Sequence, residues 1–287
     1  MHSTRSLKPD GAGAPAAIRM AGFGHALFAV TMIALGIMGL IKGGFVAIWS
    51  GVPRGLPARV ALAYLCAVVC LGSGIGLFWS RAAGIVSRVL LASFVLWMLL
   101  FRLPLIVRDP TSSGAWWACG EIAVMIAAAW VLVVWFAGGR DGTGRGLVTG
   151  FVTGERGLMI ARVLYGLGSI AFGVAHFTFL ERTVGMVPKW LPWHLGWAYF
   201  TGGALVVAGV AIIANVWARL AALLSAVELS LFTLLVWGPV IVAGPDAEQW
   251  NEFVDSWVLT AAAWVVADSY RAGPSLRPAT TPVPSLS

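Results

Sequence analysis

The sequence predicts an all-α integral membrane protein with eight transmembrane helices, arranged as two parallel, pseudo-symmetric four-helix bundles. Three observations support this fold class. Apolar residues make up 59% of the 287 positions and charged residues only 11%, whereas about 25% charged is usual in soluble domains. Apolar stretches recur at close to the ~20 residues that a helix needs to cross a bilayer. A proline-containing motif occurs twice, once in each half of the chain.

Each apolar stretch is interpreted as one membrane-spanning helix. No stretch alternates with period two, so helices are the expected spanning elements. The first stretch is longer than the 7–15 apolar residues of a signal peptide and has a counterpart in the second half, so we expect it to belong to the fold. The eight stretches are 21–41, 60–79, 82–101, 117–137, 158–178, 195–215, 217–240 and 253–268.

The repeated motif is Val-Pro-x-x-Leu-Pro, which begins at position 52 and again at position 187, 135 residues later. Pro104 and Pro239 are related by the same shift. Because each repeat holds an even number of helices, the two repeats are expected to enter the membrane from the same side. The predicted organisation is a mobile N-terminus (1–20), repeat one (21–137), a glycine-rich linker (138–157), repeat two (158–268) and a disordered C-terminal tail (269–287).

The formal charge of +7 is spread over many loops and is not gathered on one face. A nucleic-acid partner is therefore not expected, because such a partner requires a clustered basic surface. Twelve of the 19 Lys and Arg residues fall on the side of the predicted termini and seven on the opposite side. The excess of positive residues predicts that both termini are cytoplasmic, in a multi-pass protein of the cell's inner (cytoplasmic) membrane whose surroundings are the lipid bilayer.

The proline motif predicts a stiff connection before the second helix of each repeat, because a residue that precedes proline is driven out of the α region. Aromatic residues crowd around the second copy. They favour either an aromatic belt at the membrane interface or the roof of a ligand pocket. The prolines are Pro53, Pro57, Pro188 and Pro192, and the candidate aromatic ligand contacts are Trp190, Trp193 and Tyr199.

Ionisable residues within or beside the apolar stretches are candidate functional groups, because a charge inside a bilayer is costly. Glu228 lies deep within its stretch, so it is either a ligand-binding group or a protonated, hydrogen-bonded core residue. His176 and His194 are expected at the same end of repeat two, as ligand contacts or as interfacial side chains. Glu121 and Asp255 occur at equivalent places in the two repeats and are expected to stabilise each unit, for example by capping a helix N-terminus.

Metal and haem sites are not indicated. His25 and His176 are expected at opposite ends of their helices, roughly 20 Å apart in depth at 1.5 Å per residue. The sequence contains no metal-ligand spacing motif. The three cysteines are interpreted as small core residues.

Repeat two resembles the DoxX-like family of bacterial membrane proteins. The resemblance is carried by Gly173-Val-Ala-His176-Phe, by Met-Val-Pro-Lys-Trp-Leu-Pro-Trp-His-Leu-Gly-Trp-Ala-Tyr-Phe-Thr-Gly at 186–202, and by Trp250-Asn followed by Asp255. Repeat one departs from this pattern, with Gly39, Gly55 and Arg59 in place of His176, Trp190 and His194. The resemblance implies a four-helix membrane unit associated with thiosulfate:quinone or thiol redox systems, without catalytic residues that can be transferred.

Three functional hypotheses follow. The first is a quinone-interacting subunit, or a membrane subunit that serves a soluble or membrane oxidoreductase partner, with a quinone as the implied cofactor. The second is a scaffold or assembly factor without chemistry of its own. The third is a permease for a small solute or lipid that uses Glu228. Whether the protein is an enzyme is left open by the sequence.

Overall fold

The computed structural model describes residues 22–137 and 153–271. The predicted N-terminal segment 1–20, most of the linker 138–157 and most of the tail 269–287 lie outside the described residues. Every regular element within the described residues is helical. The long helices are α1 (Phe23–Lys42), α2 (Arg59–Leu77), α3 (Ala83–Trp97), α5 (Ser113–Ala137), α7 (Glu155–Thr178), α9 (His194–Ile213), α10 (Ala218–Phe232) and α12 (Ala247–Asp268).

Six shorter helical segments complete the described fold. Two of them are single π-helical turns, η2 and η3, that continue α3 and α10 without a break. The short segments are η1 (Ala47–Trp49), η2 (Met98–Arg102), α4 (Leu103–Arg108), α8 (Leu180–Met186), η3 (Thr233–Trp237) and α11 (Gly238–Ala243).

The described residues contain seven helices that are long and apolar enough to cross a membrane. They are consistent with a multi-pass helical membrane protein, and many large apolar side chains on their outer faces are exposed, as a lipid-facing surface requires. The eighth expected helix is α12. It has 22 residues but carries Glu248, Glu252 and Asp255 in its first half, and it is not among the seven. Its second half is almost completely buried.

The two π-helical turns occur at equivalent places, directly before Pro104 and Pro239. Proline lacks a backbone N–H, so it cannot form the regular helical hydrogen bond to the preceding turn. A wider π-helical turn accommodates this defect without ending the helix. The combined helices 83–108 and 218–243 are consequently 26 residues long each.

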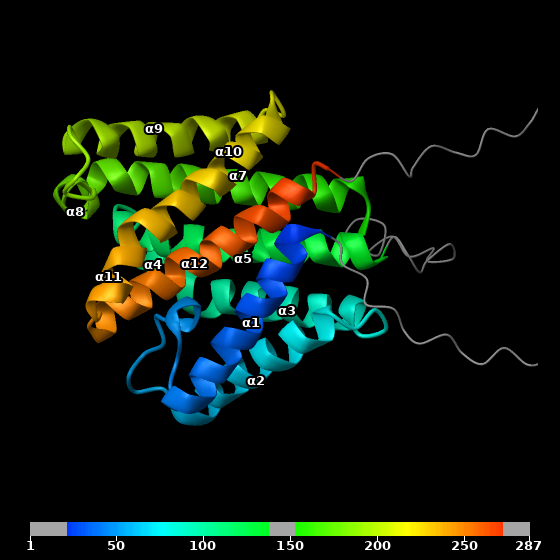
Figure 1. Cartoon of the computed structure of the whole chain (residues 1–287). Helices are drawn as coiled ribbons and strands as arrows, with labels where there is room; N and C mark the ends of the chain where they lie inside the picture. Colours follow the sequence, from blue (N-terminus) through cyan, green and yellow to red (C-terminus); the bar gives the residue numbers. More distant parts are fainter. Residues whose placement is uncertain (1–21, 138–152, 272–287) are drawn as a thin grey trace, which may run out of the picture.

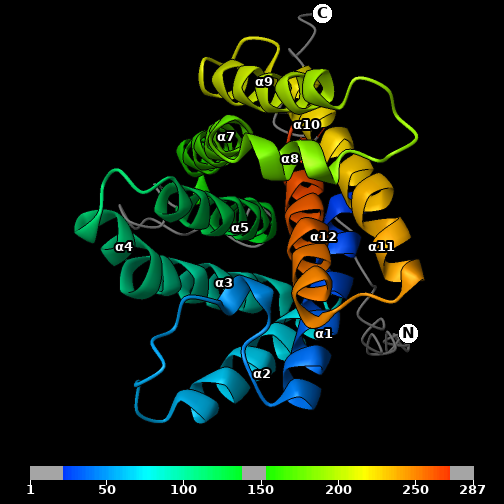
Figure 2. The ribbon, with the colours of Figure 1, turned by 90° about the vertical axis from the view of Figure 1, so that its left-hand side faces the viewer.

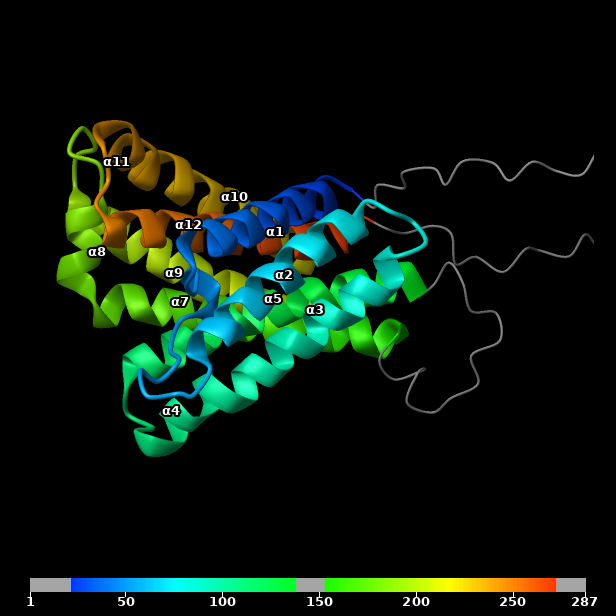
Figure 3. The ribbon, with the colours of Figure 1, turned by 90° about the horizontal axis from the view of Figure 1, so that it is seen from below.

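The helices lie roughly side by side along one direction (Figures 1 and 3). The start of α1, the end of α5, the start of α7 and the end of α12 lie together, and we name this end the terminal end. A hydrogen bond from the Gly24 backbone N–H to the Asp268 carboxylate joins α1 to α12 there. The opposite end carries α8, α4 and α11, and we name it the α8 end.

Helices α5 and α12 lie in the middle of the structure (Figure 2). The most extensive contacts of α5 are with α7, and those of α12 are with α1, so the fourth helix of each repeat packs against the first helix of the other. The first two helices of each repeat approach closely through glycine. A methyl group on Gly36 would lie 2.5 Å from the Leu71 backbone nitrogen, and one on Gly173 would lie 2.5 Å from the Gly202 carbonyl oxygen. These contacts agree with small-residue packing between membrane helices.

Candidate functional site

A cavity of about 120 Å³ lies at the α8 end of repeat two, between α5, α7, α8, α10 and α12. We name it the polar cavity because ionisable side chains contribute to its wall. These side chains are Glu121, His176, Arg182, Glu228, Glu252 and Asp255. Aromatic side chains, among them Phe172, Phe232 and Trp237, line the rest of the wall. An aromatic pocket with a few polar groups is typical of a small-molecule site.

Glu228 lies on α10 and lines this cavity, a position open to either of the two roles considered for it, a ligand-binding group or a protonated core residue. One of its carboxyl oxygens is buried and has no hydrogen-bond partner among the described residues. A buried polar atom without a partner carries a desolvation cost of about 1–3 kcal/mol. A ligand that forms a hydrogen bond with Glu228 would remove this cost.

His176 reaches the same cavity from α7. Its Nδ1 atom lies 2.8 Å from the Phe172 carbonyl oxygen, which can only accept, so Nδ1 carries the hydrogen in this contact. The Nε2 atom is then an acceptor in the neutral ring. The imidazole lies edge-on to Phe232, with 6.0 Å between ring centres. His176 and Glu228 are thus two polar groups in one largely aromatic pocket.

Glu121 and Asp255 also meet at the polar cavity, from the central helices α5 and α12. They lie close enough to interact electrostatically, together with Glu252. The predicted N-terminal capping role is wrong, because each residue lies eight positions beyond the first residue of its helix, Ser113 or Ala247. Asp246 caps α12 instead.

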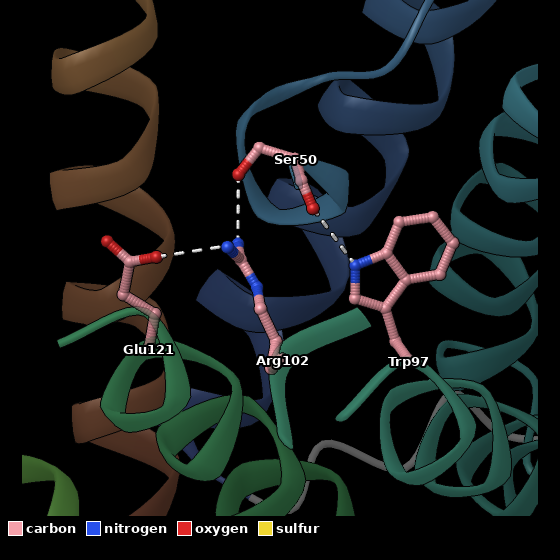
Figure 4. A network of polar contacts seen from close by, with 4 residues as sticks. All are labelled: Ser50, Trp97, Arg102 and Glu121. Carbon is pink, nitrogen blue, oxygen red and sulfur yellow. Dashed lines mark hydrogen bonds and ion pairs between the residues drawn. The ribbon is translucent and has the colours of Figure 1, made fainter. Parts of the chain in front are cut away.

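Two arginines offset this negative charge. Arg182 pairs with Glu252 at 2.7 Å near the cavity mouth. Arg102 comes from repeat one, is only 4% exposed, and places Nη2 3.7 Å from the Glu121 carboxylate (Figure 4). The same Nη2 donates to the Ser50 hydroxyl at 2.9 Å, so a buried cation that does not itself line the polar cavity lies beside Glu121 in the cavity wall.

Arg102 was not among the residues singled out by the sequence analysis, which placed it with the loop bases. The sequence did contain a signal, because Arg102 has only apolar residues on either side of it, at 94–101 and 103–107. A cation at such a position faces a partner inside the bundle more often than lipid.

A second cavity, of about 430 Å³, runs along the outside of repeat two between α9 and the α10–η3 helix. We name it the apolar groove, because its lining is dominated by side chains such as Trp190, Trp197, Phe200 and Leu231. Thr183, Glu228 and Phe232 line both the apolar groove and the polar cavity. The two cavities therefore meet at these three residues.

The remaining predicted site residues lie near this region without lining the polar cavity. Trp190 and Pro188 line the apolar groove. Trp193 is 79% exposed and adopts a left-handed conformation (φ 61°) directly before α9. Tyr199 stacks on Phe177.

His194 is the first residue of α9 and lies at the same end of repeat two as His176, but it lines neither cavity. Pro192 lies just before α9, and Pro53 and Pro57 precede α2 in the same way.

Hydroxyl groups lie below the polar cavity, toward the terminal end. The Tyr165 hydroxyl is fully buried and lies 2.8 Å from the Ser225 hydroxyl. Tyr165 is within electrostatic range of Glu228. Near the cavity wall, the Thr233 hydroxyl lies 2.7 Å from that of Ser256.

The described residues contain no group of three or more His, Cys, Asp or Glu side chains with the geometry of a metal site. Cys66, Cys70 and Cys119 are free, buried thiols. The polar cavity presents hydrogen-bonding and ionisable side chains.

Comparisons of the chain with protein-family models, with curated proteins and with solved structures return no match. The resemblance to the DoxX-like family consequently rests on the residues of repeat two quoted above.

Proposed function

We propose that repeat two is a binding site for the ring of a quinone, held in the polar cavity between His176 and Glu228. The observation that carries this proposal is the unpartnered buried oxygen of Glu228, which shares one aromatic cavity with the His176 imidazole.

The chemistry of the two residues suits both forms of such a ring. The carbonyl oxygens of a quinone accept hydrogen bonds, and a protonated Glu228 can donate one. The hydroxyl groups of a hydroquinone donate, and the His176 Nε2 atom or a Glu228 carboxylate can accept. The cavity volume of about 120 Å³ is close to the roughly 150 Å³ of an engineered protein cavity that holds benzene. It is therefore of the size of one six-membered ring.

The resemblance to the DoxX-like family supports a redox role for the bound ring. We infer that a soluble or membrane oxidoreductase partner exchanges electrons with the quinone, while this protein positions the ring within the bilayer. The side chains that line the polar cavity support the binding of the ring.

The test is equilibrium binding of a chainless benzoquinone, and separately of its hydroquinone, to the purified protein in lipid nanodiscs. Glu228→Leu is expected to weaken binding of the benzoquinone at least tenfold, because it removes the group that donates to a ring carbonyl. His176→Ala is expected to weaken binding of the hydroquinone at least tenfold, because it removes the Nε2 atom that accepts from a ring hydroxyl. His194→Ala is the matched control, since it removes an imidazole at the same end of repeat two but outside both cavities. Equal affinity of all three variants and the wild type would rule out the proposed site.

A permease that uses Glu228 is the second candidate, and the hydrogen-bonded Tyr165 and Ser225 hydroxyls below Glu228 favour it. They extend the polar groups from the cavity toward the terminal end. Proton flux into proteoliposomes, followed with a pH-sensitive dye, tests this alternative. A permease should lose flux in Glu228→Gln and in Tyr165→Phe, whereas flux no greater than in protein-free liposomes would exclude proton-coupled transport.

We further propose that α12 is an eighth membrane crossing, and that the two repeats are parallel and pseudo-symmetric with both termini in the cytoplasm of the producing cell. Corresponding helices have corresponding bounds and packing partners, which supports the duplication. The distribution of positive charge supports the orientation. Reporter fusions within 138–157 and after residue 271 should both report a cytoplasmic location. A periplasmic or external signal at either place would contradict this topology.

A further inference from the structure

The apolar groove is a feature of the lipid-facing surface, since it lies between the outer faces of α9 and α10. Leu224, Leu231 and Leu235 line it from the α10–η3 side, and all three are exposed. Trp197 and Phe200, also exposed, line it from α9. In a bilayer these side chains would contact hydrocarbon chains.

The groove continues into the polar cavity at Thr183, Glu228 and Phe232. Glu228 and Phe232 are four residues apart on α10 and therefore lie on one face of the helix, one turn from each other. Phe232 is the last residue before the π-helical turn η3. A molecule that occupied both spaces would place an apolar part in lipid and a polar part beside Glu228.

The charge around the polar cavity restricts which polar part fits. Carboxyl groups outnumber the arginines, and the one arginine that lines the cavity, Arg182, is already paired with Glu252. A phosphate group would meet repulsion from Glu121, Glu228 and Asp255 without a free cation to bind it. The site therefore favours an uncharged ring and disfavours a phospholipid head group.

We propose that the apolar groove holds the hydrophobic chain of the same ligand whose ring occupies the polar cavity, and that the ligand enters sideways from the bilayer between α9 and α10. This inference rests on the proposed function and deepens it. The ligand class is a single-chain, uncharged ring compound of the membrane phase, such as a prenylated quinone. The chain contributes affinity through apolar contact with the groove wall.

Repeat one provides a matched control for this surface. Leu231 of the groove corresponds to Leu96 at the shift of 135 residues, and both are exposed. The next position is different. Phe232 lines both cavities, whereas its counterpart Trp97 is buried against Trp49 and Phe101. Leu231→Trp should therefore fill the groove, while Leu96→Trp adds the same bulk to a lipid-facing site that leads to no polar cavity.

The experiment compares binding of a chainless benzoquinone with that of the same ring bearing a ten-carbon alkyl chain. Wild-type protein and both tryptophan variants are compared in nanodiscs of one lipid composition, so that partitioning of the ligand into lipid is common to all. For each protein, the gain in affinity is the ratio of the affinity for the ring with the alkyl chain to the affinity for the chainless ring. This gain is expected to be at least ten times larger in the wild type and in Leu96→Trp than in Leu231→Trp. The chainless ring should bind all three proteins equally.

The outcomes separate the two proposals. An equal gain from the chain in all three proteins would overturn the lateral groove while leaving the ring site intact. Failure of the chainless ring to bind the wild type would overturn the proposed function itself. Ala204→Leu, which adds bulk from the α9 side of the groove, serves as a second blocking variant if Leu231→Trp does not fold. A phospholipid that stays in the groove at saturating quinone, detected by native mass spectrometry, would also overturn the inference.

Discussion

Repeat one and repeat two share the same helix bounds over one stretch but have different contents at the α8 end. The segments α3, η2 and α4 reappear as α10, η3 and α11 with every bound shifted by 135 residues, from 83 to 218 at the start and from 108 to 243 at the end. In repeat one, Trp49 of η1 is buried and packs against Phe94 and Trp97. In repeat two, α8 takes the place of η1, and the polar cavity lies beneath it.

Repeat two also has the more polar side chains at corresponding positions. Glu228 and Ser225 on α10 correspond to Ser93 and Leu90 on α3. Tyr165 corresponds to Phe28 when the first helices are aligned by their close-packed glycines. The comparison teaches that helices with matching bounds can supply the same framework, while a few side-chain differences determine which half has room and polar partners for a ligand.

The largest effect is expected from Arg102→Leu, which removes the buried cation beside Glu121. The carboxyl group of Glu121 would then remain buried without its partner, and loss of one member of a buried pair costs about 3–5 kcal/mol. Denaturant unfolding in detergent measures the loss. Arg108→Leu is the control, because Arg108 is an exposed arginine at the end of α4. If the two variants were equally stable, the pairing of Arg102 with Glu121 would not stabilise the fold as described.

A smaller but still large effect is expected from Ser93→Glu, which gives repeat one the carboxyl group of repeat two. The space near Ser93 is filled by buried aromatic residues such as Phe94 and Trp97, so the new carboxyl group has no cavity to face. A carboxylate at such depth costs about 2.5–3.5 kcal/mol, and the same unfolding measurement detects it. If Ser93→Glu were as stable as the wild type, repeat one could also accommodate a buried carboxyl group. The proposed difference between the two repeats would then be wrong.

The smallest effects concern the starts of the two central helices. Asp246 accepts a hydrogen bond from the Gln249 backbone N–H at 2.8 Å, and the Asp246 backbone N–H donates to the Gln249 side chain at 3.0 Å. At the start of α5, the Ser112 hydroxyl accepts only one bond, from the Ala115 N–H at 3.3 Å. Asp246→Ala is expected to cost about 1 kcal/mol and Ser112→Ala less, as measured by thermal unfolding.

Asp246→Asn tests the cause of that loss, because asparagine caps a helix about as well as aspartate. The variant should keep wild-type stability. A loss equal to that of Asp246→Ala would assign the effect to the charge rather than to the cap.

The seven candidate spanning helices of the described residues could be predicted because each corresponds to a long apolar stretch in the sequence. The matching bounds of 83–108 and 218–243 could be anticipated because Pro104 and Pro239 recur at one shift. The π-helical turns before these prolines could not be predicted, because a single extra residue in a turn barely alters the spacing of apolar residues along the helix. The lower hydropathy of α12 was also missed, because its buried second half resembles a spanning stretch.

For the site, Glu228 and His176 were recognisable as polar residues in apolar surroundings. Arg102 was missed because its partner, Glu121, is on another helix and no local pattern links them. Trp49 was missed for a similar reason: its place in a connecting segment gives no sign that it fills the space between helices. His194 was placed at the correct end, but the direction of a side chain at a helix start depends on tertiary packing.

The crossed packing of the central helices has a consequence for how the protein can be divided. Because α5 contacts α7 and α12 contacts α1, a cut within 138–152 separates each central helix from the helix with which it makes its most extensive contacts. The two halves, co-expressed as separate fragments, should therefore be recovered together, and neither half should be as stable alone as in the intact chain.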